Sequence, residues 1–240
     1  MSDNYFDFFF HEIGTITGSM KRSLQHILEA FPDNSEKIDK PRIKSHAGKL
    51  TGSVELIETY IKFVTLMNNP DFYRYTRPRN IDLRGTFRKV GRIMKLKYNQ
   101  QKKKLFTDEL SDVSHVPLIE IFDVVPYIVL DNAFKYSSNA EEIYVSLNLT
   151  REGKFDIKIR SCGPYVYEDE LERLTEYQYR GENALDADVN GYGLGLYFLK
   201  EICEICEVKL KLETKKLDFK LNGVENGEFC VHLSNLTATE

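Results

Sequence analysis

One stretch in the second half of the chain combines an amide, an amine and a phenol at helical spacing. It reads LDNAFKYSS over residues 130–138 and contains Asn132, Lys135 and Tyr136. Residues three positions apart share one face of a helix, so the Asn132 amide and the Lys135 ammonium can point the same way. A helix face that carries an amide and a cation could bind part of a nucleotide.

A second stretch, some fifty-five residues later, places glycines immediately before a helix. It reads GYGLGLYFLKEI over residues 191–202, with glycine at positions 191, 193 and 195. Glycines let backbone N–H groups approach an anion closely, and the start of a helix adds unpaired N–H groups and a positive dipole end. The second stretch therefore predicts phosphate binding, and the two together predict a nucleotide pocket.

The first part of the chain has the pattern of a helical hairpin. Apolar residues recur at steps of three and four over residues 6–27, and a second such stripe runs over residues 43–67 after Pro41. Asn69 and Pro70 predict its end. Two helices alone cannot enclose a core, so we expect the hairpin to self-associate into a dimeric four-helix bundle.

The remaining chain alternates helical and strand patterns. A helix is predicted over 83–96, a short strand over 104–106, a helix over 117–136 that carries the first stretch, strands over 142–149 and 155–160, a short helix over 168–176, a loop rich in Gly, Asn and Asp over 178–192, a helix ending at 206, and strands over 208–213 and 228–233. The loop could close over a ligand. The order predicts an α+β fold in which one sheet is backed by helices, an α/β sandwich.

These patterns suggest three segments. Residues 1–70 form the hairpin, residues 71–80 form a linker, and residues 81–240 form the second, ligand-binding domain. The chain of 240 residues is long enough for both.

Composition excludes several classes of function. A net charge of −4 offers no basic field for nucleic acid. The absence of an apolar run of membrane-spanning length, and the small number of cysteines, predict a cytoplasmic chain without a membrane segment of its own. Cys203 and Cys206 form a CxxC, but they lack a second pair at metal-ligand spacing and lie in an apolar helical pattern, so we expect them to pack in the core.

Four short sequences in the second half resemble the ATP-binding boxes of the bacterial two-component sensor histidine kinases. The sequences are LDNAFKYSS, SCGP at 161–164, EYQYRGENA at 176–184 and GYGLGL at 191–196. In that family the ATP-binding half belongs to the gyrase, chaperone and MutL-like ATPase superfamily. Their order and spacing make the resemblance specific, although each alone would be weak.

The resemblance extends to the hairpin. HEIGT, residues 11–15, is similar to the family's phosphoacceptor box. A neutral imidazole is nucleophilic near pH 7, and beside His11 a neighbouring carboxylate, Glu12, can orient the ring and take its proton. Thr15 shares the face of His11 at four positions' distance. Glu12 and Thr15 also match the family pattern Glu-x-x-Thr. In family members with this pattern, the threonine positions a water that removes the phosphoryl group from the partner protein.

The resemblance implies a histidine protein kinase that uses Mg²⁺ and ATP. His11 would be phosphorylated with Glu12 as base, and the phosphoryl group would pass to an aspartate on the receiver domain of a response regulator. Asn132 would bind Mg²⁺, and the dimer would form through the hairpins. The residues that would bind the nucleotide are Asn132, Lys135, Tyr136, Ser161, Gly163, Arg180, Gly191, Gly193 and Gly195.

The chain departs from the family pattern at the adenine end. Ser161 stands where an aspartate usually accepts a hydrogen bond from the adenine amino group, and Ile128 stands where a second asparagine is usual. A neutral hydrogen bond of roughly 0.5–1.5 kcal/mol in place of a charge-assisted one of about 1.5–3 would weaken affinity about tenfold. One alternative therefore stays open, a degenerate kinase acting as a dimeric nucleotide-sensing or receiver-binding module. A third reading, a kinase-like switch without a role for the histidine, gives no reason for the HEIGT hairpin.

Overall fold

The computed structural model describes residues 3–31, 38–98, 103–106, 115–137, 141–150, 154–186 and 192–237. The chain divides into two compact units, Met1–Asn68 and Asn69–Glu240. Within the described residues, none of the helices combines the length and the apolar character that crossing a membrane requires.

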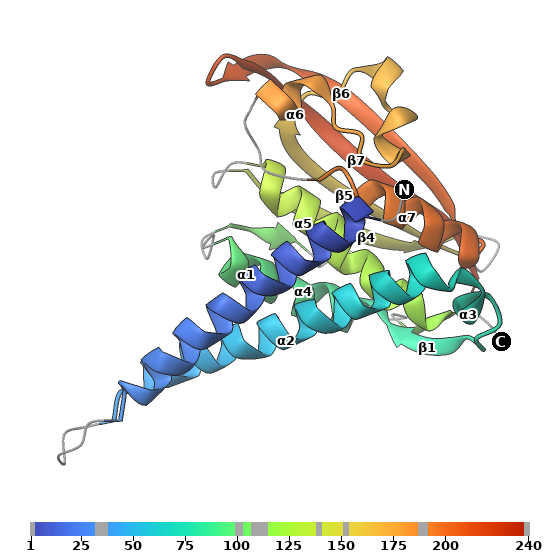
Figure 1. The fold of residues 1–240 in the computed structure, drawn as a ribbon. Coiled ribbons are helices and arrows are strands. Elements are labelled where there is room, and N and C mark those ends of the chain that lie inside the picture. The colour runs from blue at the N-terminus through green and yellow to red at the C-terminus, as the bar shows by residue number, and fades with distance from the viewer. Residues whose placement is uncertain are drawn as a thin grey trace. The chain divides into compact units, whose positions relative to one another are not determined.

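The first unit is an antiparallel pair of helices, α1 (Asp3–Leu28) and α2 (Lys40–Asn68), which run side by side in Figure 1. Between them, Phe9 is buried, and its ring lies 5.8 Å from that of Tyr60 and 6.5 Å from that of Phe63. Toward the connection between the helices, Arg42 Nη2 lies 2.8 Å from Glu29 Oε2. Apolar side chains outside this seam remain exposed, among them Leu24, Leu28, Val54 and Ile61.

The second unit is an α+β domain built on a five-stranded sheet with the order β2-β4-β5-β7-β6. The strands are β2 (Leu105–Phe106), β4 (Ile143–Leu149), β5 (Lys154–Pro164), β6 (Lys209–Leu221) and β7 (Val224–Thr237). β2 pairs with β4 in parallel, and the other pairs are antiparallel. A separate ribbon joins β1 (Arg79–Asp82) to β3 (His115–Leu118).

The longer helices of this unit cover one face of the sheet. They are α4 (Leu83–Lys97), α5 (Val125–Tyr136) and α7 (Gly195–Ile205) (Figure 1). Side chains that alternate along the central strands face them: Ile143, Val145 and Leu147 on β4 are buried, as are Ile157 and Ile159 on β5. The intervening positions are polar, so among the described residues the apolar packing lies on the helical face of the sheet, as is common for antiparallel sheets.

The predicted helix over 117–136 is wrong at its start. Pro117 lies in β3, opposite Asn80, and a 3₁₀ turn, Glu120–Val124, separates that strand from α5. α5 begins next to Pro126, because a proline lacks the N–H that a helix interior needs but is tolerated in its first turn. The chemistry-bearing end of the helix is unaffected.

Other expected elements differ in kind or extent. In place of a helix over 168–176 there are two 3₁₀ turns, Glu168–Glu170 and Arg173–Thr175. The segment expected as a linker holds a short helix, α3 (Pro70–Arg74), and the start of β1. The loop over 178–192 contains α6 (Glu182–Asp186), and residues 187–191 lie outside the described residues.

The last two strands are longer than their apolar pattern indicates. The pairing of β6 with β7 continues to Leu221 and Val224 around a turn in which Asn222 and Gly223 have positive φ. Two-residue hairpin turns need this conformation, and Asn-Gly adopts it readily. The tight turn therefore extends the pairing beyond the apolar stretches.

Candidate functional site

The structure brings the first predicted stretch against the second. A Cβ atom placed on Gly195 would lie 3.4 Å from both Nδ2 and Oδ1 of Asn132, so the amide lies beside the first residue of α7. Leu194 precedes that helix and has no polar side chain to cap its free N–H groups. An amide side chain and a helix start that its N-cap residue does not cap thus lie together on the helical face of the sheet.

Gly193 joins the second stretch to the segment that carries Arg180. Its φ is +67°, and a Cβ at this position would lie 2.5 Å from the backbone oxygen of Tyr179 and 2.6 Å from the backbone carbon of Gln178. Only glycine accepts both the left-handed conformation and this close approach. Gly191, predicted to act with these glycines, lies outside the described residues.

Tyr136, at the end of α5, contacts both of the remaining predicted segments, SCGP at 161–164 and EYQYRGENA at 176–184. A Cβ on Gly163 would lie 2.8 Å from the Tyr136 backbone oxygen, so the end of β5 closely approaches the end of α5. Burial raises the pKa of Tyr136, while the charge of Arg180 and its hydrogen bond to the phenol oppose that rise. Lys135 Nζ lies 5.5 Å from the centre of the same ring. Arg180 and Lys135 therefore both lie beside Tyr136.

The residues that depart from the family pattern lie near this cluster. Ile128 is buried, and its Cγ2 atom lies 3.7 Å from a Cβ placed on Gly195. Ser161 lies on β5 opposite Phe229 of β7, and alternation along β5 puts it on the same face of the sheet as Ile157 and Ile159. The apolar side chain of Ile128 offers no ligand atom to a metal ion at this part of α5.

The predicted phosphoacceptor group lies in the hairpin. The side chain of His11 is 64% exposed, and its Nδ1 atom lies 3.8 Å from Glu12 Oε1. Glu12 Oε2 accepts a hydrogen bond of 2.9 Å from the hydroxyl of Tyr60 on α2. Thr15, one turn beyond His11, is exposed. The apolar pattern of the helices does not predict this contact of Tyr60, because Glu12 lies 48 positions away along the chain.

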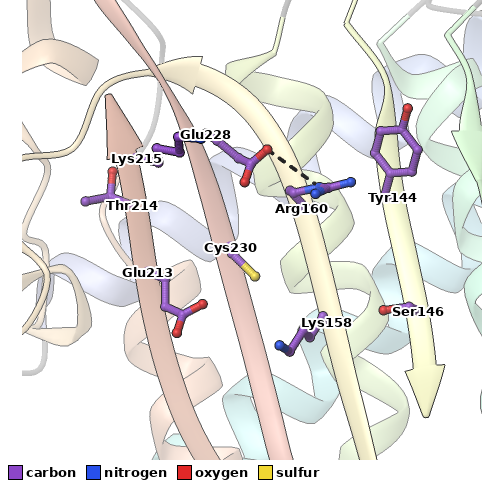
Figure 2. Close-up of a pocket in the computed structure, with 9 residues that line it drawn as sticks. All are labelled: Tyr144, Ser146, Lys158, Arg160, Glu213, Thr214, Lys215, Glu228 and Cys230. Atoms are coloured by element: carbon purple, nitrogen blue, oxygen red, sulfur yellow. Dashed lines mark ion pairs between the residues drawn. The ribbon is translucent and has the colours of Figure 1, made fainter. Parts of the chain in front are cut away.

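A hollow of about 330 Å³ lies on the opposite face of the sheet, and Figure 2 shows its lining. Cations from β5 and β6 (Lys158, Arg160 and Lys215) alternate there with Glu213 and Glu228. Arg160 Nε lies 3.6 Å from Glu228 Oε2 and is paired with it in Figure 2. Its lining carries three cations against two carboxylates, and the hollow lies on the other face of the sheet from the Asn132 cluster.

Of the CxxC pair, Cys203 is a core residue, whereas Cys206 is half-buried. Cys203 is buried in α7, and burial raises the pKa of its thiol. Burial also raises the pKa of Cys206, to about 12. Neither thiol would be a thiolate near neutral pH. Among the described residues, no group of three or more His, Cys, Asp or Glu side chains could hold a metal ion.

Comparison with known proteins gives matches in the second unit. A family model described as histidine kinase-, DNA gyrase B-, and HSP90-like ATPase matches residues 125–234. Sensor histidine kinase YkoH of Bacillus subtilis is 33% identical over 88 residues, which are 37% of this chain and 19% of YkoH. Adaptive-response sensory kinase SasA of Crocosphaera subtropica is 31% identical over 107 residues, 44% of this chain and 28% of SasA. The matches span less than a third of either relative.

Among solved structures, that of full-length ShkA in complex with AMPPNP is similar over the whole chain. The similarity covers 100% of this chain and 47% of ShkA, with a TM-score of 0.52 and 14% sequence identity. At this identity the similarity shows a shared fold.

Proposed function

We propose that this chain is the catalytic core of an ATP-dependent histidine protein kinase. The premise is the match of residues 125–234 to the family model of histidine kinase-, DNA gyrase B-, and HSP90-like ATPases. The chain would phosphorylate His11 and pass the phosphoryl group to an aspartate of a response regulator. The observation that carries the proposal is the meeting of Asn132, Tyr136 and Arg180 with the glycines at 163, 193 and 195.

ATP would bind on the helical face of the sheet. The uncapped N–H groups at the start of α7 and the cations Lys135 and Arg180 would meet the phosphates. ShkA, which shares the fold, has been solved with AMPPNP bound. Mg²⁺ at phosphate sites usually keeps several waters and is bound through substrate phosphates and one or two protein side chains, mostly carboxylates. The Asn132 amide oxygen would be the protein ligand here, a role that asparagine has in protein kinases. When bound, the ion would neutralise charge on the phosphate oxygens.

The hairpin geometry suits His11 as the acceptor. With Nδ1 facing Glu12 Oε1 at 3.8 Å, the lone pair of Nε2 is left for the γ-phosphorus. The N–P bond forms as the bond from phosphorus to the bridging oxygen breaks, ADP leaves with that electron pair, and Glu12 takes the Nδ1 proton. The Tyr60 hydroxyl, 2.9 Å from Glu12 Oε2, holds the carboxylate in this orientation.

The exposed apolar side chains of the hairpin support dimerisation. Leu24, Leu28, Val54 and Ile61 are each at least 44% exposed, and burying them against a second hairpin would complete a four-helix bundle. Ile61→Glu should convert a dimer to a monomer in sedimentation equilibrium, whereas Lys62→Glu, a polar neighbour, should not. A wild-type monomer at micromolar concentration would contradict this assembly.

The central experiment is labelling of the full chain with Mg²⁺ and γ-labelled ATP. We expect acid-labile label that disappears in His11→Ala and persists in His26→Ala, a half-buried histidine on the same helix. Asn132→Ala should abolish the thermal stabilisation by Mg-ATP, which for the wild type is about 2.7 kcal/mol at a hundredfold excess over Kd. Thr15→Ala should keep autophosphorylation but lose dephosphorylation of the regulator. Label that persists in His11→Ala would refute the proposed acceptor.

The departures Ile128 and Ser161 support a second candidate, a dimeric nucleotide-sensing or receiver-binding module without phosphotransfer. This candidate predicts that the wild-type protein is stabilised by Mg-ATP, or captures a receiver domain, but takes up no label from γ-labelled ATP. A switch that makes no use of the histidine would instead retain its full effect in His11→Ala.

A further inference from the structure

Glu170 is a buried carboxyl group that the proposed reaction does not use. It ends the 3₁₀ turn after β5, and its residue is 6% exposed. Glu168 in the same turn is exposed, as an acidic residue usually is. Burying a carboxylate is unfavourable unless hydrogen bonds replace its hydration. The contacts of Glu170 therefore indicate what the burial achieves.

Both carboxylate oxygens of Glu170 accept hydrogen bonds. Oε1 contacts the segment that carries Arg180, and Oε2 contacts the residue just before the 3₁₀ turn. Oε1 accepts from the Tyr179 hydroxyl at 2.9 Å and from the Glu182 backbone N–H at 2.9 Å. Oε2 accepts from the Tyr167 backbone N–H at 3.1 Å. The Glu182 N–H is one of the unpaired donors at the start of α6, so the carboxylate also caps that helix.

The two contacts at Oε1 lie on either side of Arg180 in the chain. Tyr179 precedes Arg180 by one residue, and Glu182 follows it by two. A second tether comes just after, where the buried Asn183 donates from Nδ2 to the backbone oxygen of Tyr165 at 2.7 Å. Arg180 itself bonds to Ala184 O at 3.2 Å and to the Tyr136 phenol. Its backbone is thus fixed on both sides.

We propose that Glu170 is a positioning residue that holds the segment 179–182 so that Arg180 stays beside Tyr136 and faces the transferred phosphate. The role of Arg180 rests on the proposed function, but its position beside Tyr136 does not. Phosphoryl transfer depends on how cations are placed around the phosphorus, and a displacement of about 1 Å can cost a hundredfold in rate. Glu170 acts through Arg180 and touches no reacting atom.

The test compares Glu170→Ala, Glu170→Gln and Tyr179→Phe with the exposed control Glu168→Ala. We expect Glu170→Ala to slow His11 labelling at saturating Mg-ATP by about tenfold or more while ATP affinity changes less than about threefold, as for loss of a transition-state contact. Glu170→Gln keeps one acceptor oxygen and should be intermediate. Tyr179→Phe removes a single donor and should slow labelling by roughly threefold.

A second readout reports the position of Arg180 without catalysis. In NMR titration of ¹³C-labelled tyrosine, the pKa of Tyr136 should rise in Glu170→Ala because Arg180 no longer opposes the effect of burial. Equal labelling rates and equal Tyr136 titrations in Glu170→Ala and Glu168→Ala would overturn the proposal. If Glu170→Ala fails to fold, an unchanged rate and titration in Tyr179→Phe would overturn it. Unlabelled wild type with a shifted Tyr136 titration would refute the kinase but retain the positioning role.

Discussion

Replacing Gly193 with alanine should destabilise the second unit for two separable reasons. The left-handed backbone at φ +67° costs an L-residue about 1–2 kcal/mol. The new methyl group would also lie 2.5 Å from the backbone oxygen of Tyr179. That contact is with backbone and cannot be relieved by a side-chain rotation, so we assign it the usual overpacking cost of about 1–3 kcal/mol.

Gly223 provides the matched control. Its φ is +84°, but a Cβ there meets nothing within 4 Å. Gly223→Ala therefore carries only the conformational cost, and both variants share the small gain from a less flexible unfolded chain. The difference in free energy of unfolding, Gly193→Ala minus Gly223→Ala, should be about 1–3 kcal/mol, with Gly193→Ala the less stable.

Urea unfolding of the full-length variants measures this difference. The chain has no tryptophan, so circular dichroism and tyrosine fluorescence are the suitable signals. Both glycines lie in the same unit, so the same transition is compared. Stabilities that agree within about 0.5 kcal/mol, the usual limit of additivity, would refute the close packing of Gly193 on residues 178–179.

Three further predictions concern stability. Asp82 caps α4 by accepting from Gly85 N at 2.8 Å, so Asp82→Ala should cost about 1 kcal/mol in urea unfolding and Asp82→Asn much less. Phe9→Ala should lower the free energy of unfolding of the hairpin by about 3–5 kcal/mol, whereas the 71% exposed Phe10 should tolerate alanine. Burial lowers the pKa of Lys103 to about 8 from 10.5, so the folded state loses that proton before the unfolded state does, and the free energy of unfolding should rise with pH between these values. Lys103→Met should abolish this rise and should be more stable than the wild type by about 1–3 kcal/mol below pH 8. An equal rise with pH in both proteins would refute this.

Periodicity located most of the helices because helical burial repeats over a few residues. The pattern over 83–96 predicts a helix, and α4 spans Leu83–Lys97; the helical pattern that ends at Cys206 corresponds to α7. The same reasoning failed over 117–124, where a proline is compatible both with an edge strand and with a helix start. The partner strand β1 decided between them, and its four residues, RNID, carry no strong strand pattern.

The sequence by itself determined the residue types and their order along the chain: an amide and a cation on one helix, glycines before another, and a histidine followed by a carboxyl group. These are local properties, since spacing along a helix or before its first turn depends on the nearest residues only. Tertiary structure alone decided which groups meet. The Tyr60 hydroxyl reaches Glu12 across 48 positions, and the Glu170 carboxylate reaches the Glu182 N–H across 12. Contacts at such separations are set by packing between elements, which no local pattern encodes.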